Sequence, residues 1–313
     1  MKRVAVTGAL MAFAAGLHSF GVAEAQAPQP PTPASPSSPA IPNASAVNLN
    51  ITPKRLVFDR NTRAGTVYIF NQGTQTATFD IALVERVMLP NGIIEAVAEL
   101  RDDPAAQPVI ARLASAQSIL VSSPRRVTLA PGRGQTIRVR ASQPAGAAGE
   151  YRSHLTVTTL PPREAGVTAE RAQAEAGSQL SFRINSVFGL SIPVIVRSGQ
   201  VDARGEISGA SIESAMLSTD GVSAPAPTSV LRFALKRLGA NSLFGNIEVR
   251  TGRGRGEVIG LARGVGVYPE IDDRLIELPL RRRLRSGERV EITFTDDDSN
   301  PGRVIARASA AAP

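Results

Sequence analysis

The side chains that could carry out chemistry are few in this sequence. The chain has no cysteine, and once the leader containing His18 is set aside, His154 is its single histidine. One histidine leaves no His-based triad with a spare orienting group and no multi-histidine metal site. The acidic run Asp296–Asn300 lacks the spaced ligands and the closing Glu of a calcium loop. We therefore expect a protein that is not an enzyme and that holds neither a metal nor a cofactor.

The charge of the chain comes from arginine rather than lysine. The formal charge is +8, and beyond the leader the lysines are Lys54 and Lys236 alone. Arginine suits bidentate contacts with a carboxylate or a phosphate. The arginines are scattered, however, with a single run at Arg281–Arg283 and no basic stripe interleaved with aromatic residues. This distribution argues against a nucleic-acid partner.

One stretch, residues 179–192, has a period-2 pattern that could serve recognition. Six apolar side chains share one phase of this pattern: Leu180, Phe182, Ile184, Phe188, Leu190 and Ile192. Such alternation predicts a strand with one buried face, which Pro193 would interrupt. At about a dozen residues the stretch is longer than most globular strands. It is either an ordinary strand of a sandwich or a strand built to pair with a partner's chain.

The first 45 residues have the pattern of a targeting signal followed by a spacer. Lys2 and Arg3 precede an apolar run that is short for a membrane span, and Ala23-Glu24-Ala25 has the small-x-small pattern of a signal peptidase site. Residues 1–25 are therefore expected to be a cleaved signal peptide, without stable membrane insertion. Residues 26–45, rich in Pro, Ala and Ser, predict a disordered leader.

The rest of the chain predicts an all-β fold. Short β-branched or alternating runs recur between turn signals, a pattern typical of β-sandwiches. Residues 104–116 alone suggest a loop or a short helical turn. A change to Gly, Ser and Ala near Ser198 and Gly199 predicts a hinge. We expect two Ig-like domains in tandem, residues 46–197 and residues 198–313, the second ending in a disordered tail.

Several motifs occur in a recognisable order between Val47 and Arg197. They are Thr52–Asp59, Val67–Asn71, Leu120–Pro124, Leu129–Gly132 followed by Ile137–Val139, Gly149–Leu155 and Leu160–Pro162. In this order they resemble the periplasmic chaperones of chaperone–usher pilus assembly. The second half of the chain matches only in general pattern, for example at Phe244–Val249.

The resemblance implies a boomerang of two Ig-like domains that caps pilus subunits by donor-strand complementation. In that family the last strand of the first domain fills a groove in an incomplete subunit. Leu180, Phe182 and Ile184, with Phe188 on the same phase, would be the donated side chains. Burying each large apolar side chain is worth roughly 1.5–3 kcal/mol.

The family also holds the subunit's terminal carboxylate with two cations, and Arg55 matches the first. A guanidinium and a partly desolvated carboxylate form a strong bidentate pair. At the position aligned with the second cation, a Lys in the family, the sequence has Gly189. The residues that could take its place are Arg183, Arg152 and Arg197.

The resulting hypothesis is a periplasmic, non-enzymatic chaperone that delivers pilus subunits to an outer-membrane usher. The alternative is an exported two-domain Ig-like binding protein unrelated to pili. A pilus subunit is a third possibility, but residues 26–45 lack the alternation that a donated N-terminal extension needs. An enzyme fits least, since no nucleophile–base pair is present.

Overall fold

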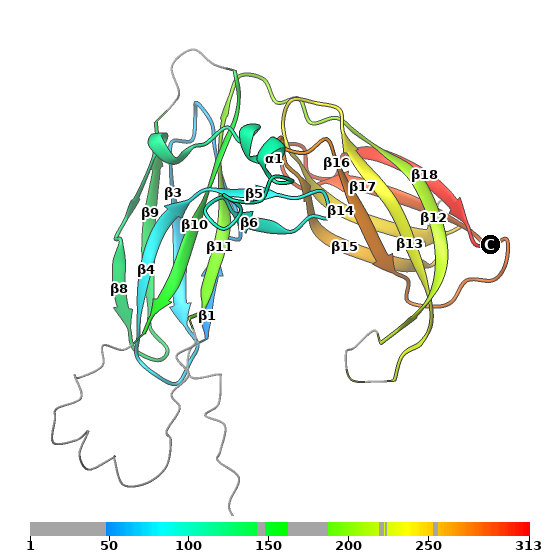
Figure 1. Ribbon diagram of the computed structural model, residues 1–313, viewed down its shortest axis with the longest axis horizontal. Coiled ribbons are helices and arrows are strands. Elements are labelled where there is room, and N and C mark those ends of the chain that lie inside the picture. The colour runs from blue at the N-terminus through cyan, green and yellow to red at the C-terminus, as the bar shows by residue number, and fades with distance from the viewer. Residues whose placement is uncertain (1–47, 143–147, 162–186, 219–221, 223, 253–255) are drawn as a thin grey trace, which may run out of the picture. The chain divides into compact units, whose positions relative to one another are not determined.

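The computed structural model describes residues 48–142, 148–161, 187–218, 222, 224–252 and 256–313. These residues form an all-β fold of two Ig-like β-sandwiches, as the sequence predicts (Figure 1). The first sandwich ends with β11, and β12 begins the second after residues 199–204. Residues 1–47, which contain the expected signal peptide and Pro-rich leader, lie outside this description.

The first sandwich packs a four-stranded sheet of order β1-β3-β9-β7 against a five-stranded sheet of order β2-β11-β10-β4-β8. The strands of the first sheet are β1 (Leu49–Thr52), β3 (Ala64–Asn71), β7 (Leu120–Ser123) and β9 (Gly134–Ala141). The strands of the second are β2 (Leu56–Phe58), β4 (Ala77–Val84), β8 (Arg126–Leu129), β10 (Gly149–Leu160) and β11 (Gly189–Ser198). Inward side chains alternate with outward ones along β3 and β9, as a sandwich requires, whereas the middle of β10 is buried on both faces.

Between β4 and β7 the chain makes an excursion with a small core of its own. It contains the hairpin of β5 (Arg86–Met88) and β6 (Ile94–Ala96), the helix α1 (Gln107–Ala111) and the 3-10 turn η1 (Gln117–Ile119). Val87, Leu100 and Ala106 are its buried apolar residues. The short helix lies in the segment where the sequence suggests a helical turn.

The second sandwich packs a three-stranded sheet of order β12-β13-β16 against a four-stranded sheet of order β15-β14-β17-β18. The three strands are β12 (Gly205–Leu217), β13 (Ala226–Arg237) and β16 (Asp273–Pro279). The four are β14 (Leu243–Thr251), β15 (Val258–Val267), β17 (Arg289–Asp296) and β18 (Val304–Ala311). Phe233, Leu235, Ile247 and Phe294 are among its fully buried residues.

The expected disordered tail is wrong, because the last residues form β18. This strand pairs with β17 from Val304 to Ala311, and the Ala312 N–H donates to the Glu288 carbonyl. Ala306 and Ala310 are buried in the core of the second sandwich. Their small side chains fit where the two sheets approach closely, so an alanine-rich sequence that resembles a tail is a core-facing strand.

The excursion of the first sandwich also contacts the second one. The backbone carbonyl of Pro90, in the β5–β6 turn, accepts a hydrogen bond of 3.1 Å from the Leu275 N–H of β16. Gly92 lies in the same turn with φ +84°, and a Cβ there would sit 2.1 Å from Nε of Arg274. A residue with a side chain would be strained at this φ, and the Arg274 guanidinium would have to move aside. The turn therefore depends on glycine to reach the edge of β16.

Candidate functional site

The candidate site begins at the open edge of β11. This strand pairs with β10 along its whole length, but on its other side β2 pairs only with Val194–Val196. Within the described part of the chain, no strand pairs with Gly189–Pro193 on that side. Exposed strand edges are normally short or blocked, because they invite pairing with another chain. This one is available to a partner strand.

The hydrogen bonds of β10 determine which backbone groups face that edge. The Thr159 N–H donates to the Phe188 carbonyl at 2.8 Å, so Phe188 directs its carbonyl toward β10. Alternate residues of an antiparallel strand point to opposite sides. The N–H and C=O groups of Gly189 and Ser191 therefore face the open edge, and Pro193 presents a carbonyl alone.

Pro193 does not interrupt the strand, which corrects the sequence prediction. It pairs with His154 of β10, inside a strand that runs from Gly189 to Ser198. A proline is tolerated in a sheet where its nitrogen faces an edge and no N–H is needed. The alternation satisfies this condition at position 193.

The apolar phase of β11 emerges from the protein's own core toward the N-terminal end of the strand. Val196, Val194 and Ile192 are at most 2% exposed, and Leu190 is half-buried. Phe188, the next residue on this phase, is 43% exposed. Leu180, Phe182 and Ile184, which the sequence places on the same phase, lie outside the described residues, as does Arg183.

Arg55 lies in the segment that joins β1 to β2, where the chain passes from one sheet to the other. Its side chain is 10% exposed, and Nη2 donates to Oδ2 of Asp298 at 2.8 Å. The guanidinium also stacks on the ring of Phe244, 4.3 Å from its centroid. Nε and Nη1 are buried and have no hydrogen-bond partner among the described residues. Burial lowers the pKa of Arg55, and Asp298 opposes this shift.

Arg197 is held next to Arg55 by the same carboxylate. Its Nη2 donates to Oδ2 of Asp298 at 2.5 Å, and its Nε donates to Oε2 of Glu150 at 2.9 Å. Burial works against the charged form of Arg197, but Glu150 and Asp298 outweigh it and raise the pKa. We call Arg55, Arg197, Glu150 and Asp298 the arginine–carboxylate cluster.

Arg152 belongs to a second buried ion pair and is not open to a ligand. Its guanidinium is 2% exposed, bonds Glu270 and the Arg86 carbonyl, and stacks on Tyr268 at 3.8 Å. Glu270 also accepts the Met88 N–H at 2.8 Å. The pair therefore joins β10 and the excursion of the first sandwich to the β15–β16 turn of the second.

Of the predicted cations, the structure brings Arg55 and Arg197 together and places Arg152 elsewhere. The parallel register of β2 and β11 pairs Leu56 with Val194, so the strand residue beside Arg55 is Pro193 rather than Gly189. Sequence reasoning missed Glu150 and considered Asp298 only as part of the acidic run Asp296–Asn300. No local pattern marks Asp298, because its role depends on side chains about 100 and 243 residues away.

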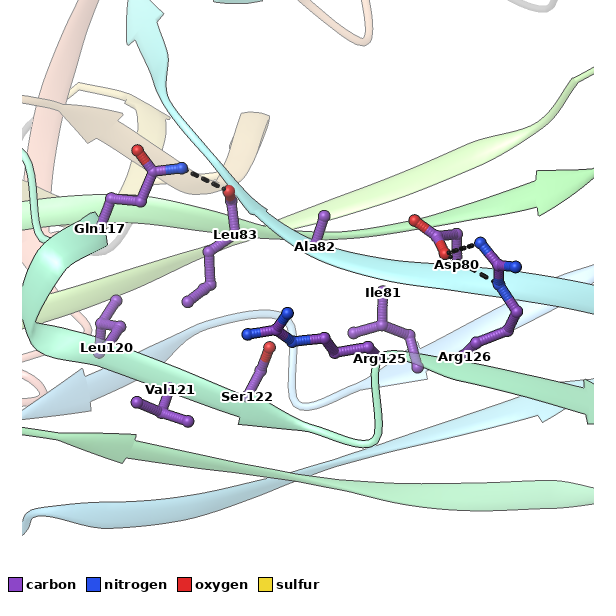
Figure 2. Close-up of a pocket in the computed structure, with 10 residues that line it drawn as sticks. All are labelled: Asp80, Ile81, Ala82, Leu83, Gln117, Leu120, Val121, Ser122, Arg125 and Arg126. Atoms are coloured by element: carbon purple, nitrogen blue, oxygen red, sulfur yellow. Dashed lines mark hydrogen bonds and ion pairs between the residues drawn. The ribbon is translucent and has the colours of Figure 1, made fainter.

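A separate hollow of about 630 Å³ lies between β4 and β7. The Gln117 side-chain amide donates to the Leu83 carbonyl at 3.0 Å, and Arg126 bonds Asp80 (Figure 2). The Ile81 N–H donates to the Arg125 carbonyl at 2.8 Å. These bonds satisfy backbone groups of β4 at Ile81 and Leu83, past the part of the strand that pairs with β8. This edge is partly capped, in contrast to the open edge of β11.

His154 is buried in β10, and its environment predicts how stability depends on pH. Burial first, and then the nearby Arg152 and Arg86 guanidinium groups, lower the pKa of His154 from 6.5 to about 2. Below pH 6.5 the unfolded chain binds a proton at His154 that the folded protein excludes. The free energy of unfolding therefore decreases as the pH is lowered. Between pH 7 and 5 the free energy of unfolding should drop by roughly 2 kcal/mol from this group.

Urea unfolding of the wild type and of His154→Phe, at both pH values, tests this expectation. The ring nitrogens of His154 have no hydrogen-bond partner among the described residues, so phenylalanine removes no bond. The variant should lose most of the pH dependence in this window. An unchanged slope in the variant would assign the effect to other groups.

No family model matches the chain, and no curated protein matches it. Solved structures do. The Pseudomonas aeruginosa CupB2 chaperone is 13% identical over 84% of this chain and 100% of its own, with a TM-score of 0.38. The E. coli chaperone DraB is 12% identical over 85% and 97%, with a TM-score of 0.40. The Salmonella enterica SafB chaperone, solved with the SafA pilin, is 12% identical over 84% and 96%, with a TM-score of 0.39.

Two further features of the described residues bear on the site. None of their helices is long and apolar enough to cross a membrane. Their His, Asp and Glu side chains form no group of three or more that could hold a metal ion. The chemistry that the site offers is strand pairing beside a buried guanidinium.

Proposed function

We propose that this protein is a periplasmic chaperone that caps pilus subunits and delivers them to an outer-membrane usher. The observation that carries this proposal is the strand β11, whose apolar phase leaves its own core at Phe188 beside backbone groups that no described strand pairs with. A partner sheet could add a strand there and receive the exposed side chains in its own core. Leu180, Phe182 and Ile184 would extend the donated surface.

Arg55 is proposed to anchor the terminal carboxylate of the subunit, with Arg197 as the second cation. Arg55 has two buried nitrogens without a partner among the described residues, which are costly to leave unsatisfied. A carboxylate is the group that best matches such donors. In this proposal residues 1–25 direct export and are removed, and each sandwich acts as one domain.

A periplasmic pull-down with the tagged protein tests the function. Wild type should retain small, aggregation-prone subunits of pilin type. Arg55→Ala should bind them about 10- to 100-fold more weakly, because a charge-assisted hydrogen bond is worth about 1.5–3 kcal/mol. Lys54→Ala, which removes the adjacent exposed cation, is the matched control and should behave as wild type.

The alternative is an exported Ig-like binding protein unrelated to pili. If wild type retains no such subunits, or if the Phe182→Asp plus Ile184→Asp double variant retains the same partners as wild type, donor-strand capping is wrong. If only the strand variant loses its partners, the chaperone stands and Arg55 is not its anchor.

A further inference from the structure

The loop that joins β16 to β17 concentrates positive charge at one end of the second sandwich. Residues 280–289 contain five arginines and a single acid, Glu288. The Gly287 N–H in this loop donates to the Ala312 carbonyl at 2.9 Å, so the loop lies beside the end of β18 (Figure 1). The strand proposed to bind subunits, β11, belongs to the other sandwich.

The backbone of this loop is held at several points. The Leu280 N–H donates to the Ser229 carbonyl at 2.8 Å, and the Leu284 N–H donates to Oγ of Ser229 at 3.0 Å. The Arg281 N–H donates to the Ile259 carbonyl at 2.7 Å. Leu280 and Leu284 are 1% and 7% exposed. Because the backbone is already ordered, a ligand that binds the arginines of this loop has little backbone entropy to remove.

The arginines of the loop fall into two groups by burial. Arg282 is half-buried and bonds both acids within reach, Glu257 at 3.2 Å and Glu288 at 2.6 Å. Three others are exposed and form no ion pair with a described acid: Arg281, Arg283 and Arg285. We call these three residues the arginine row. Their charges are available to a partner.

An exposed apolar side chain lies next to the arginine row. Ser229 of β13, to which the loop is bonded, pairs with Ser214 of β12. Met216 is two residues further along β12, about 7 Å away, and is 62% exposed. A single exposed methionine needs no explanation by itself. Beside cations without an acidic partner, it completes the combination that suits a membrane interface, positive charge for lipid phosphates and apolar surface for the acyl boundary.

We propose that the arginine row and Met216 form a peripheral docking surface for a membrane that exposes anionic phospholipids. Guanidinium groups bind phosphates in a bidentate manner, and each cation adds to the attraction of the anionic surface. A nucleic acid fits less well, because single strands stack their bases on aromatic side chains and neither residues 211–229 nor residues 280–289 contain one. This inference goes beyond the proposed function and does not depend on it. A protein held in this way would keep β11 free for a subunit.

Co-sedimentation of the protein with large vesicles tests this docking. Wild type should sediment with vesicles of equal parts phosphatidylcholine and phosphatidylglycerol, and not with phosphatidylcholine alone. Replacing the arginine row by Arg281→Ser, Arg283→Ser and Arg285→Ser together should weaken binding about 100-fold, because each cation near an anionic surface contributes about a factor of five. Met216→Ser, which leaves every charge in place, should weaken binding several-fold.

A second triple variant, Arg133→Ser with Arg138→Ser and Arg140→Ser, provides the matched control. It removes the same charge from exposed positions of the first sandwich and should bind within a few-fold of wild type. Equal losses in the two triple variants would assign binding to net charge and overturn the inference, as would failure of wild type to bind the phosphatidylglycerol vesicles. Tighter binding of labelled oligothymidine than of vesicles, unchanged by Met216→Ser, would assign the arginine row to a nucleic acid instead. None of these results bears on the capture of subunits, which the pull-down measures separately.

Discussion

Phe188→Asp is expected to weaken capture of subunits by at least about 100-fold in the periplasmic pull-down. Phe188 is the described residue at which the apolar phase of β11 leaves the core, with 43% of its surface exposed. Burying a phenylalanine is worth roughly 1.5–3 kcal/mol, and placing a carboxylate in an apolar groove adds a penalty of its own. Each 1.4 kcal/mol changes affinity tenfold. The loss should appear as subunits in the aggregated fraction.

Val187→Asp provides a matched control for this variant. Val187 is the neighbouring residue, is 57% exposed and lies on the opposite phase of the strand. The same charge at this position should leave capture within a few-fold of wild type. Equal losses in the two variants would mean that charge near the strand, rather than the donated face, determines binding.

Arg152→Met is expected to lower the free energy of unfolding by about 3–5 kcal/mol, the usual result of removing one partner of a buried ion pair. Arg152 and Glu270 are each 2% exposed, and Glu270 would remain as an uncompensated buried charge. Methionine retains the apolar volume of the side chain, so the effect is mainly electrostatic. Urea denaturation followed by circular dichroism gives the value.

Two further variants separate this effect from a general loss of packing. Adding Glu270→Gln to Arg152→Met removes the excess charge and keeps an oxygen for the Met88 N–H, so stability should recover by at least about 1 kcal/mol. Arg112→Ala removes an exposed pair with Asp272, whose side chains are 43% and 75% exposed, and should change stability by less than about 1 kcal/mol. A double variant less stable than Arg152→Met would contradict the electrostatic explanation.

The long strands could be predicted from the sequence because their signal is local. The alternation over residues 77–84 predicts a strand with the bounds of β4, and the run from residue 206 to Leu217 predicts a strand that matches β12 within one residue. No comparable pattern marks the four-residue strands β1 and β8 or the β5–β6 hairpin. Each is too short to show a period and is fixed by the neighbour with which it pairs.

Of the candidate site, the sequence could predict Arg55 and Phe188 but not the residues that surround them. Arg55 was found through a motif around its own position, and Phe188 through its phase in the strand. Their surroundings come from distant segments: Phe244 stacks on Arg55, and Asp298 bonds both Arg55 and Arg197. Such contacts arise when strands far apart in the chain meet, and alternation along one strand carries no information about them.

The contact between the β5–β6 turn and β16 limits how modular the two sandwiches are. The carbonyl of Pro90 satisfies an N–H at the edge of the second sandwich, and Arg152 balances the buried charge of Glu270. Separated from residues 86–116 and from β10, the second sandwich would have an open edge next to Leu275, which is 52% exposed, and an unpaired carboxylate. Hybrid proteins made by exchanging domains between related chains must therefore transfer the excursion and its arginine together with the β15–β16 turn. For the same reason we expect related chains to inherit the two sandwiches together.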